Sequence, residues 1–195
     1  MKKYRGFLTA SLLLLAACAL SPQIVSIQPD VQVAHPATHK GVLALEVADV
    51  RGSKVLGQRG GVYGDTSDIS TRGDIAGAVR QSLATALDKM GYEVIADQSV
   101  PALRVEIAEL GYRVIEDKLT RHIETRAAVN AVFKKEQQTF TNTYAVTRNK
   151  EMLTAPDERE NTKLINATLA AALQQMLEDA KLFSLMDGDA RNSSN

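Results

Sequence analysis

The sequence predicts an α+β fold: one two-layer domain in which a mostly antiparallel sheet of about four to six strands carries two amphipathic helices on one face. Two segments, near residues 74–90 and 157–183, repeat apolar residues at the helical period. Between them, residues 102–147 largely alternate apolar and polar side chains, which indicates strands with one dry face. Two helices and one half-solvated sheet can bury their apolar stripes only by meeting on the same sheet face.

The chain divides into four expected parts. These are residues 1–17 (signal peptide), 18–40 (tether), 41–186 (the single domain) and 187–195 (polar tail). The domain has about 145 residues, enough for one hydrophobic core. The tether is rich in proline and shows no helical period, but alternation at Val25 and Ile27 leaves open that part of it forms an edge strand interrupted by Pro29.

Residues 41–50 form the first expected strand, and a glycine-rich segment follows it. Residues 49–68 hold five glycines, which predicts a hairpin or a long loop. The segment contains no phosphate-binding motif, because no Lys-Ser/Thr pair follows the glycines and G-x-G-x-x-G is not formed. Two interpretations stay open. The segment is a hairpin tip without a role, or it is a docking loop in which Arg51 and Arg59 form bidentate hydrogen bonds with carboxylates or phosphates of a partner.

The two expected helices have clear boundaries. Thr71 and Asp74 resemble a capping box before the first helix, and Gly91 supplies a left-handed stop after it. A short strand, YEVIA, leaves this helix. The second helix begins around residues 154–157 and ends near residues 183–187. Its apolar stripe is Ile165, Leu169, Leu173, Met176, Leu177 and Ala180.

The central strands contain a phase slip. Apolar residues fall at odd-numbered positions up to Ile107 and at even-numbered positions from Leu110 onward. A regular strand cannot absorb such a slip without turning its core face to solvent, so we expect a β-bulge at residues 108–111. A hairpin through residues 116–120 leads to a second strand, and a third, from Phe140 onward, presents an exposed ladder of threonines. An antiparallel meander is the simplest topology.

The N-terminus carries a secretory signal. Three basic residues precede an apolar run over residues 7–17, which is too short to span a bilayer. The run ends in Leu15, Ala16, Ala17 and Cys18, which resembles the bacterial lipobox. The resemblance implies a diacylglyceryl group on the Cys18 sulfur, cleavage after Ala17 and acylation of the new amine; the alternative is a plain signal followed by a stray thiol. Ala19 in place of an aspartate resembles outer-membrane sorting signals.

Composition argues against several function classes. Removing residues 1–17 takes away three basic and no acidic residues, leaving 20 Lys and Arg against 23 Asp and Glu. The chain also has no Trp and no run of like charge, so we expect no nucleic-acid binding. Once Cys18 is lipidated, no thiol remains for a disulfide or a cysteine-based metal site.

The remaining candidates for chemistry have simpler structural explanations. His35 and His39 flank Pro36 in the tether, which does not suit a helical metal site. His122 falls on the polar parity of its strand. The acidic residues at 157, 158 and 160 occupy a first helical turn, where negative charge is favoured without any catalytic role. We therefore expect no metal site and no catalytic residues.

Taken in order, the residues resemble the YajG family of uncharacterised bacterial lipoproteins. The resemblance is carried by the lipobox and by Asp49, Arg51, Val55, Leu56, Gly57, Gly91, Tyr92, Val94, Leu103, Val105, Ile107, Leu110, Tyr112, Val114, Thr125, Ala127, Tyr144, Asn161, Asn166, Leu169, Leu173, Met176, Asp179 and Leu182. It implies a location and a fold, and it brings no catalytic or cofactor residues.

Three functions are therefore weighed. The preferred hypothesis is a non-enzymatic outer-membrane lipoprotein, anchored at Cys18, whose periplasm-facing domain binds or scaffolds an envelope component, with an envelope protein as the expected partner. The alternative is a carrier or chaperone for an envelope ligand such as a lipid or a peptidoglycan fragment; a hydrolase comes third. A flat polar sheet face would favour the scaffold, an apolar cavity the carrier, and a cleft of convergent titratable groups the enzyme.

Overall fold

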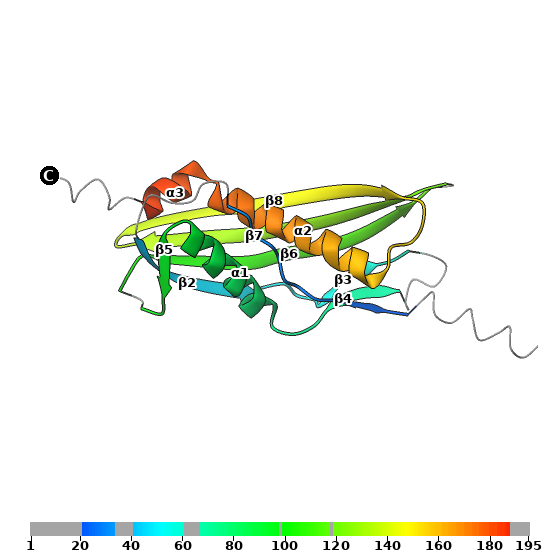
Figure 1. The fold of residues 1–195 in the computed structure, drawn as a ribbon, viewed down its shortest axis with the longest axis horizontal. Helices are drawn as coiled ribbons and strands as arrows, with labels where there is room; N and C mark the ends of the chain where they lie inside the picture. Colours follow the sequence, from blue (N-terminus) through cyan, green and yellow to red (C-terminus); the bar gives the residue numbers. More distant parts are fainter. Residues whose placement is uncertain (1–20, 34–40, 61–66, 98, 118, 188–195) are drawn as a thin grey trace, which may run out of the picture.

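The structure, a computed structural model, describes residues 21–33, 41–60, 67–97, 99–117 and 119–187. Cys18 and the expected signal peptide lie outside these residues. The described chain forms two layers, a long curved sheet and helices packed on it (Figure 1). Its elements are β1 (Gln23–Val25), β2 (Gly41–Asp49), β3 (Val55–Gln58), β4 (Asp68–Thr71), α1 (Ile75–Lys89), β5 (Tyr92–Ile95), β6 (Ala102–Glu116), β7 (Arg121–Lys135), β8 (Gln138–Met152), α2 (Glu158–Leu177) and α3 (Ala180–Met186).

The sheet is larger than expected and mixed. The described residues form eight strands, with β6 at the centre; β7 and β8 follow it as the predicted antiparallel meander. The other edge of β6 pairs in parallel with β2 near its start and with β3 at Tyr112. β5 and the β3–β4 hairpin extend these two branches, and β1 pairs in parallel with β4. The prediction of a mostly antiparallel sheet of four to six strands was therefore wrong in size and in pairing.

The length of β6 explains this arrangement. At about 3.3 Å per residue, a strand of 15 residues has room along one edge for two shorter strands. Parallel pairing of β2 with β5 needs a crossover between them, and α1 supplies it. The predicted bulge is confirmed, because the β6–β7 register shifts between Ile107 and Glu109. Leu103, Val105, Ile107, Leu110 and Tyr112 consequently all face the core.

The helices pack on one face of the sheet, as predicted, but their boundaries differ. α1 packs on β2 and β5, and α2 packs on β7 and β8. The N-cap of α1 is Asp74, which accepts a hydrogen bond from the Gly77 amide, whereas Thr71 belongs to β4. The second predicted helix is two helices. The chain turns after Leu177, because the Asp179 carboxylate caps a new helix, α3.

Part of the expected tether is built into the domain. β1 is an edge strand, and Val25, Ile27 and Val31 are buried in the core. Asn166 of α2 holds this segment, since its side chain accepts from the Gln28 amide at 2.7 Å and donates to the Ser26 carbonyl at 2.8 Å. Residues 21–33 are therefore fixed to the domain over their length.

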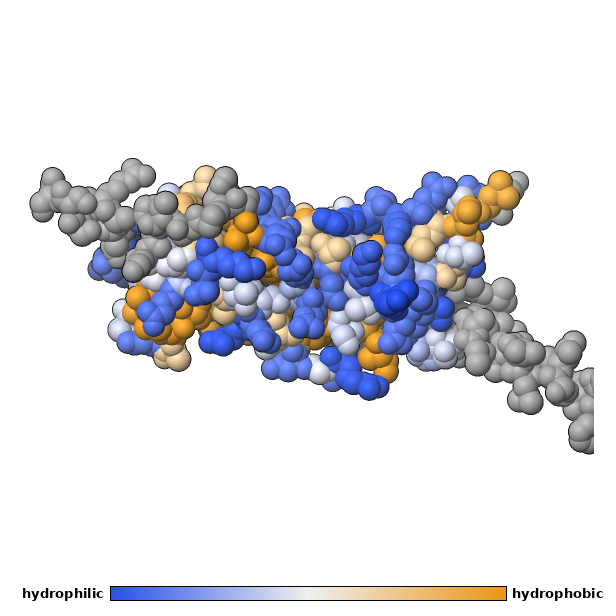
Figure 2. All heavy atoms as spheres, viewed as in Figure 1, coloured by the Kyte–Doolittle hydropathy of each residue, from blue (hydrophilic) through white to orange (hydrophobic). Residues whose placement is uncertain are grey.

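The face that carries the helices is mostly hydrophilic toward solvent (Figure 2). Polar residues on the outer sides of α1 and α2 account for this, because their apolar stripes point into the sheet. Among the described residues, the helices are too short or too polar to cross a membrane.

Candidate functional site

The sheet face opposite the helices is polar and open. Its outward side chains come from the three long strands and alternate with the core residues, as the period-two pattern predicted. On β8 the expected exposed ladder of threonines is confirmed. The outward polar residues are Arg104, Glu106, Arg113, Glu124, Arg126, Asn130, Thr139, Thr141, Thr143 and Thr147.

The charges on this face pair with one another. Arg104 forms ion pairs with Glu46 at 2.9 Å and with Glu106 at 3.0 Å. Arg113 pairs with Glu124 at 2.9 Å. Each arginine thus carries its own acidic neighbour, so the face presents alternating charge without a strong field. Pairs as exposed as these contribute about 0 to 1 kcal/mol each, which suits recognition better than stability.

β8 ends the sheet, and residues 138–147 of its outer edge lack the usual protection. Among the described strands it pairs only with β7, in one continuous register without a bulge. Natural edge strands are commonly guarded by lysine, proline or a bulge. Residues 138–147 of β8 contain no charged residue and no proline. Apart from the Thr143 amide, which donates to the Asn142 side chain at 2.9 Å, this stretch offers backbone groups that have no neighbouring strand, the arrangement by which an extended segment of another chain adds to a sheet.

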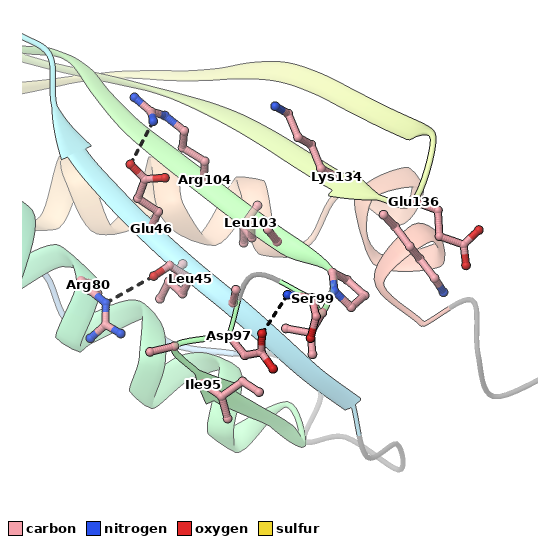
Figure 3. Close-up of a pocket in the computed structure, with 16 residues that line it drawn as sticks. Leu45, Glu46, Arg80, Ile95, Asp97, Ser99, Leu103, Arg104, Lys134 and Glu136 are labelled. Atoms are coloured by element: carbon pink, nitrogen blue, oxygen red, sulfur yellow. Dashed lines mark hydrogen bonds and ion pairs between the residues drawn. The ribbon is translucent and has the colours of Figure 1, made fainter.

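A cleft of about 800 Å³ opens at one end of the sheet, between β2, α1 and the link from β5 to β6 (Figure 3). Arg80 of α1 lines the cleft, and its Nε donates to the Leu45 carbonyl of β2 at 3.3 Å. Asp97 accepts from the Ser99 amide at 2.9 Å, and this hydrogen bond lowers the pKa of the Asp97 carboxyl. The lining residues include no His and no Cys.

A second cavity, of about 590 Å³, lies where the C-terminal ends of α1 and α2 meet α3. Val33, Met90, Leu177, Ala180 and Phe183 make its lining mostly apolar. It lies between helices, and none of the residues described as lining it comes from the sheet. An apolar ligand would find mostly apolar contacts there.

The two predicted docking arginines are both engaged by the chain itself. The Arg51 side chain is only 5% exposed, and its Nε and Nη2 donate to the two carboxylate oxygens of Asp49 at 2.8 and 2.9 Å. Arg51 lies in the link between β2 and β3, as expected, but its side chain is buried and turned toward Asp49. Arg59 Nη1 donates to the Ser21 carbonyl at 3.1 Å, which ties the β3–β4 hairpin to the start of β1.

The other candidates are placed as follows. His122 lies on the polar sheet face, with its ring 3.4 Å from the Thr120 hydroxyl. Asp157 is the N-cap of α2, and Glu160 forms an ion pair with Lys150, so these acids serve the helix start. His35 and His39 lie outside the described residues. Within the part of the chain that the structure describes, His, Cys, Asp and Glu form no group suited to a metal ion.

A buried polar cluster, which the sequence pattern did not predict, lies beneath β1. Asn161 of α2 is fully buried and donates to the Gln23 side chain at 2.6 Å. Nearby on α2, the Thr168 hydroxyl lies 2.6 Å from that of Thr125. Burial also raises the pKa of Tyr112 to about 12, so its hydroxyl stays neutral. The available signal was that Asn161 lies on the apolar stripe of α2, four residues before Ile165.

A family model described as "Uncharacterized lipoprotein" matches residues 28–186. No curated protein matches the chain. Among solved structures, protein XCC0632 from Xanthomonas campestris is similar in fold, with a TM-score of 0.52 and 12% identity, over 88% of this chain and 99% of that chain. A neuraminyllactose-binding hemagglutinin homolog from Helicobacter pylori has a TM-score of 0.45 and 12% identity, over 84% and 96%. Lipoprotein GNA1162 from Neisseria meningitidis has a TM-score of 0.33 and 10% identity, over 72% and 100%.

Proposed function

Because the chain belongs to this family of uncharacterised, YajG-type lipoproteins, we propose that it is a non-enzymatic outer-membrane lipoprotein, anchored through lipid at Cys18, whose domain faces the periplasm and binds an envelope protein. The anchor follows from the lipobox. Attached acyl chains contribute about 0.8 kcal/mol per buried methylene, and two or more of them hold a protein firmly in a membrane.

The observation that carries the binding role is the unguarded edge of β8. An extended segment of a partner can pair with residues 138–147 through backbone hydrogen bonds, while the threonines and the paired charges of the open face select its side chains. Edge and open face adjoin along the whole of β8, so they form one continuous binding surface.

Photo-crosslinking in living cells tests this role. A photoreactive residue at Thr141 or Ala145, both exposed on β8, is expected to capture the same envelope protein. The control position is Gln81, exposed on α1. Should the β8 positions capture nothing, or only what Gln81 captures, the proposed surface is wrong.

A variant with lysines on the edge strand β8 gives a second test. With the photoreactive residue kept at Thr141, Thr139→Lys with Thr143→Lys places two lysines on the edge, as natural edge strands do, and should remove the crosslink without unfolding the domain. The charge-matched control is Gln81→Lys with Thr85→Lys on α1, which should keep it. Persistence of the crosslink in the β8 variant would contradict strand addition.

The apolar cavity favours a second candidate, a carrier for a lipid or a peptidoglycan fragment. Displacement of a fluorescent fatty acid tests it. Ala180→Trp should fill the cavity and reduce binding, whereas Gln175→Trp, on an exposed position of α2, should not. If the two variants bind the probe equally, the cavity is not a carrier site.

A further inference from the structure

Three large apolar side chains stand exposed at one end of the long strands. Leu119, in the β6–β7 turn, is 85% exposed; Leu153, just after β8, is 82% exposed; and Ile115, near the end of β6, is 47% exposed. The two leucines flank the last strand pair, Arg121 with Met152, so they lie at the same tip. Figure 2 shows hydrophobic side chains gathered at this end of the sheet. We call these three residues the leucine tip.

The tip carries little net charge next to its leucines. Arg121 forms an ion pair with Glu116 at 3.1 Å, directly below the turn. An apolar tip with neutralised flanks can approach the polar surface of a bilayer without strong repulsion, and leucine side chains gain free energy there by leaving water.

The chain enters the domain at the same end. The Ser21 carbonyl accepts a hydrogen bond from Arg59. Gly60, which follows Arg59 in the chain, lies against Val114 and Glu116 of β6, just below the tip. In Figure 1, β1 starts at the end of the molecule toward which β6 and β8 point. The first described residue therefore lies at the same end of the molecule as the leucine tip.

This position limits how far the domain can move from its anchor. Three peptide steps separate Cys18 from Ser21, which span at most about 11 Å. The expected tether over residues 18–40 cannot lengthen this reach, because residues 21–33 are bound to α2 and β4. A lipid on Cys18 would consequently hold the leucine-tip end of the domain close to the bilayer surface.

We propose that the leucine tip inserts into the surface of the same phospholipid bilayer that holds the Cys18 lipid. The inference rests on the lipid anchor of the proposed function. Two contacts at one end, the lipid and the tip, fix the direction of the long strands relative to the membrane. The free edge of β8 then points sideways, where an extended segment of a partner can reach it.

The test uses the full lipidated protein in vesicles of phosphatidylethanolamine and phosphatidylglycerol. Lipidated Cys18 is the only native cysteine, so Glu151→Cys can carry a fluorophore at the tip end and Gln138→Cys one at the opposite end of the sheet. Quenchers on the lipid chains should quench the label at position 151 at least about threefold more than the label at position 138. In the background Leu119→Gln with Leu153→Gln, this preference should disappear while the protein still floats with the vesicles.

The outcomes separate the two proposals. If the protein does not float with the vesicles, the lipid anchor fails. If it floats but both labels are quenched equally, the anchor stands and the tip inference is overturned. If a photoreactive residue at position 119 captures a protein in cells in place of lipid, the tip is a protein-docking surface and the inference is likewise overturned.

Discussion

Replacing Arg51 with Ala is expected to destabilise the domain, although the sequence placed this residue in a loop. Its two hydrogen bonds to the Asp49 carboxylate are of the charged kind, which contribute about 1.5–3 kcal/mol each. Two effects offset part of this gain: Asp49 is partly exposed, and Arg51 Nη1 is buried without a hydrogen-bond partner. We therefore expect Arg51→Ala to lower the free energy of unfolding by about 2 kcal/mol.

Urea denaturation at two pH values measures both the size and the origin of the effect. The hydrogen bond from Arg51 is the main cause that lowers the pKa of Asp49 below 3.8. A carboxyl with a lowered folded-state pKa stabilises the protein above its unfolded pKa, and this stabilisation is lost as the pH falls through the folded-state value. The difference between wild type and Arg51→Ala should be complete at pH 7 and should shrink below pH about 4.

Two variants serve as controls. Asp49→Asn should cost a similar amount, and the double variant should cost less than the sum, because each change removes the same pair. Arg59→Ala, which loses one hydrogen bond to the Ser21 carbonyl, should cost no more than about 1 kcal/mol. If Arg51→Ala unfolds at the same urea concentration as the wild type at pH 7, the stabilising role assigned to this pair is refuted.

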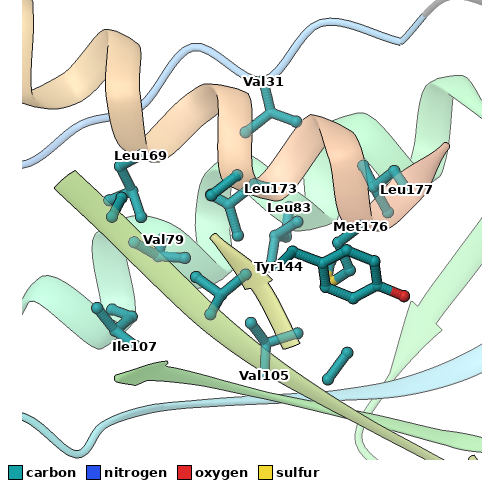
Figure 4. Packing of buried hydrophobic residues seen from close by; sticks show 14 of the residues in the cluster. Val31, Val79, Leu83, Val105, Ile107, Tyr144, Leu169, Leu173, Met176 and Leu177 are labelled. Atoms are coloured by element: carbon teal, nitrogen blue, oxygen red, sulfur yellow. The ribbon is translucent and has the colours of Figure 1, made fainter. Parts of the chain in front are cut away.

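Three further changes test the core, the α3 junction and the anchor. Figure 4 shows Leu173 among core residues of both helices and the sheet. Because Leu173 is completely buried, Leu173→Ala should lower the free energy of unfolding by about 2–5 kcal/mol, against about 0–1 kcal/mol for Glu124→Ala. Equal urea midpoints for the two variants would contradict this packing. Tyr144→Phe removes the 2.6 Å hydrogen bond that lowers the pKa of Asp179, so it should cost about 1 kcal/mol at pH 7 and less in acid, measured by thermal unfolding. Cys18→Ala should leave an unacylated precursor outside the outer-membrane fraction, and an unmodified Cys18 in the wild type, found by mass spectrometry, would remove the anchor.

The sequence was informative wherever one strand or helix faces a single core. The parity switch after Ile107 located the β-bulge, because only an extra residue keeps both halves of β6 facing inward. The spacing of Val79, Leu83 and Leu173 likewise identified the buried faces of both helices. These are local patterns, and they indicate which face of a helix or strand is buried in the core.

Pairing between distant segments left no such pattern. β1 has three residues, and its partner β4 lies more than forty positions later in the chain, so neither indicates the other. Alternation on β8 predicted the exposed threonines, but the position of β8 at the edge depends on the whole strand order. The hydrogen bond from Tyr144 to Asp179 at the start of α3 likewise forms only after β8 and α2 have packed together.

The position of the apolar cavity bears on the choice between carrier and scaffold. α2 begins near Asn161, which contacts β1 beside the chain entry, and it ends at Leu177, which lines the cavity. Sixteen helical residues separate these points, a distance of about 24 Å. A domain held at its leucine-tip end therefore carries the cavity well away from the membrane surface.

This separation argues against direct collection of lipid from the anchoring membrane, because an acyl chain would have to cross water to reach the cavity. It suits a domain that presents its β8 edge to the periplasm. A fluorophore at Glu178→Cys, on the rim of the cavity, tests the geometry in the lipidated protein. We expect lipid-borne quenchers to leave it as bright as the label at position 138. Strong quenching at position 178 would show that the cavity opens toward the bilayer, and it would shift the balance to the carrier.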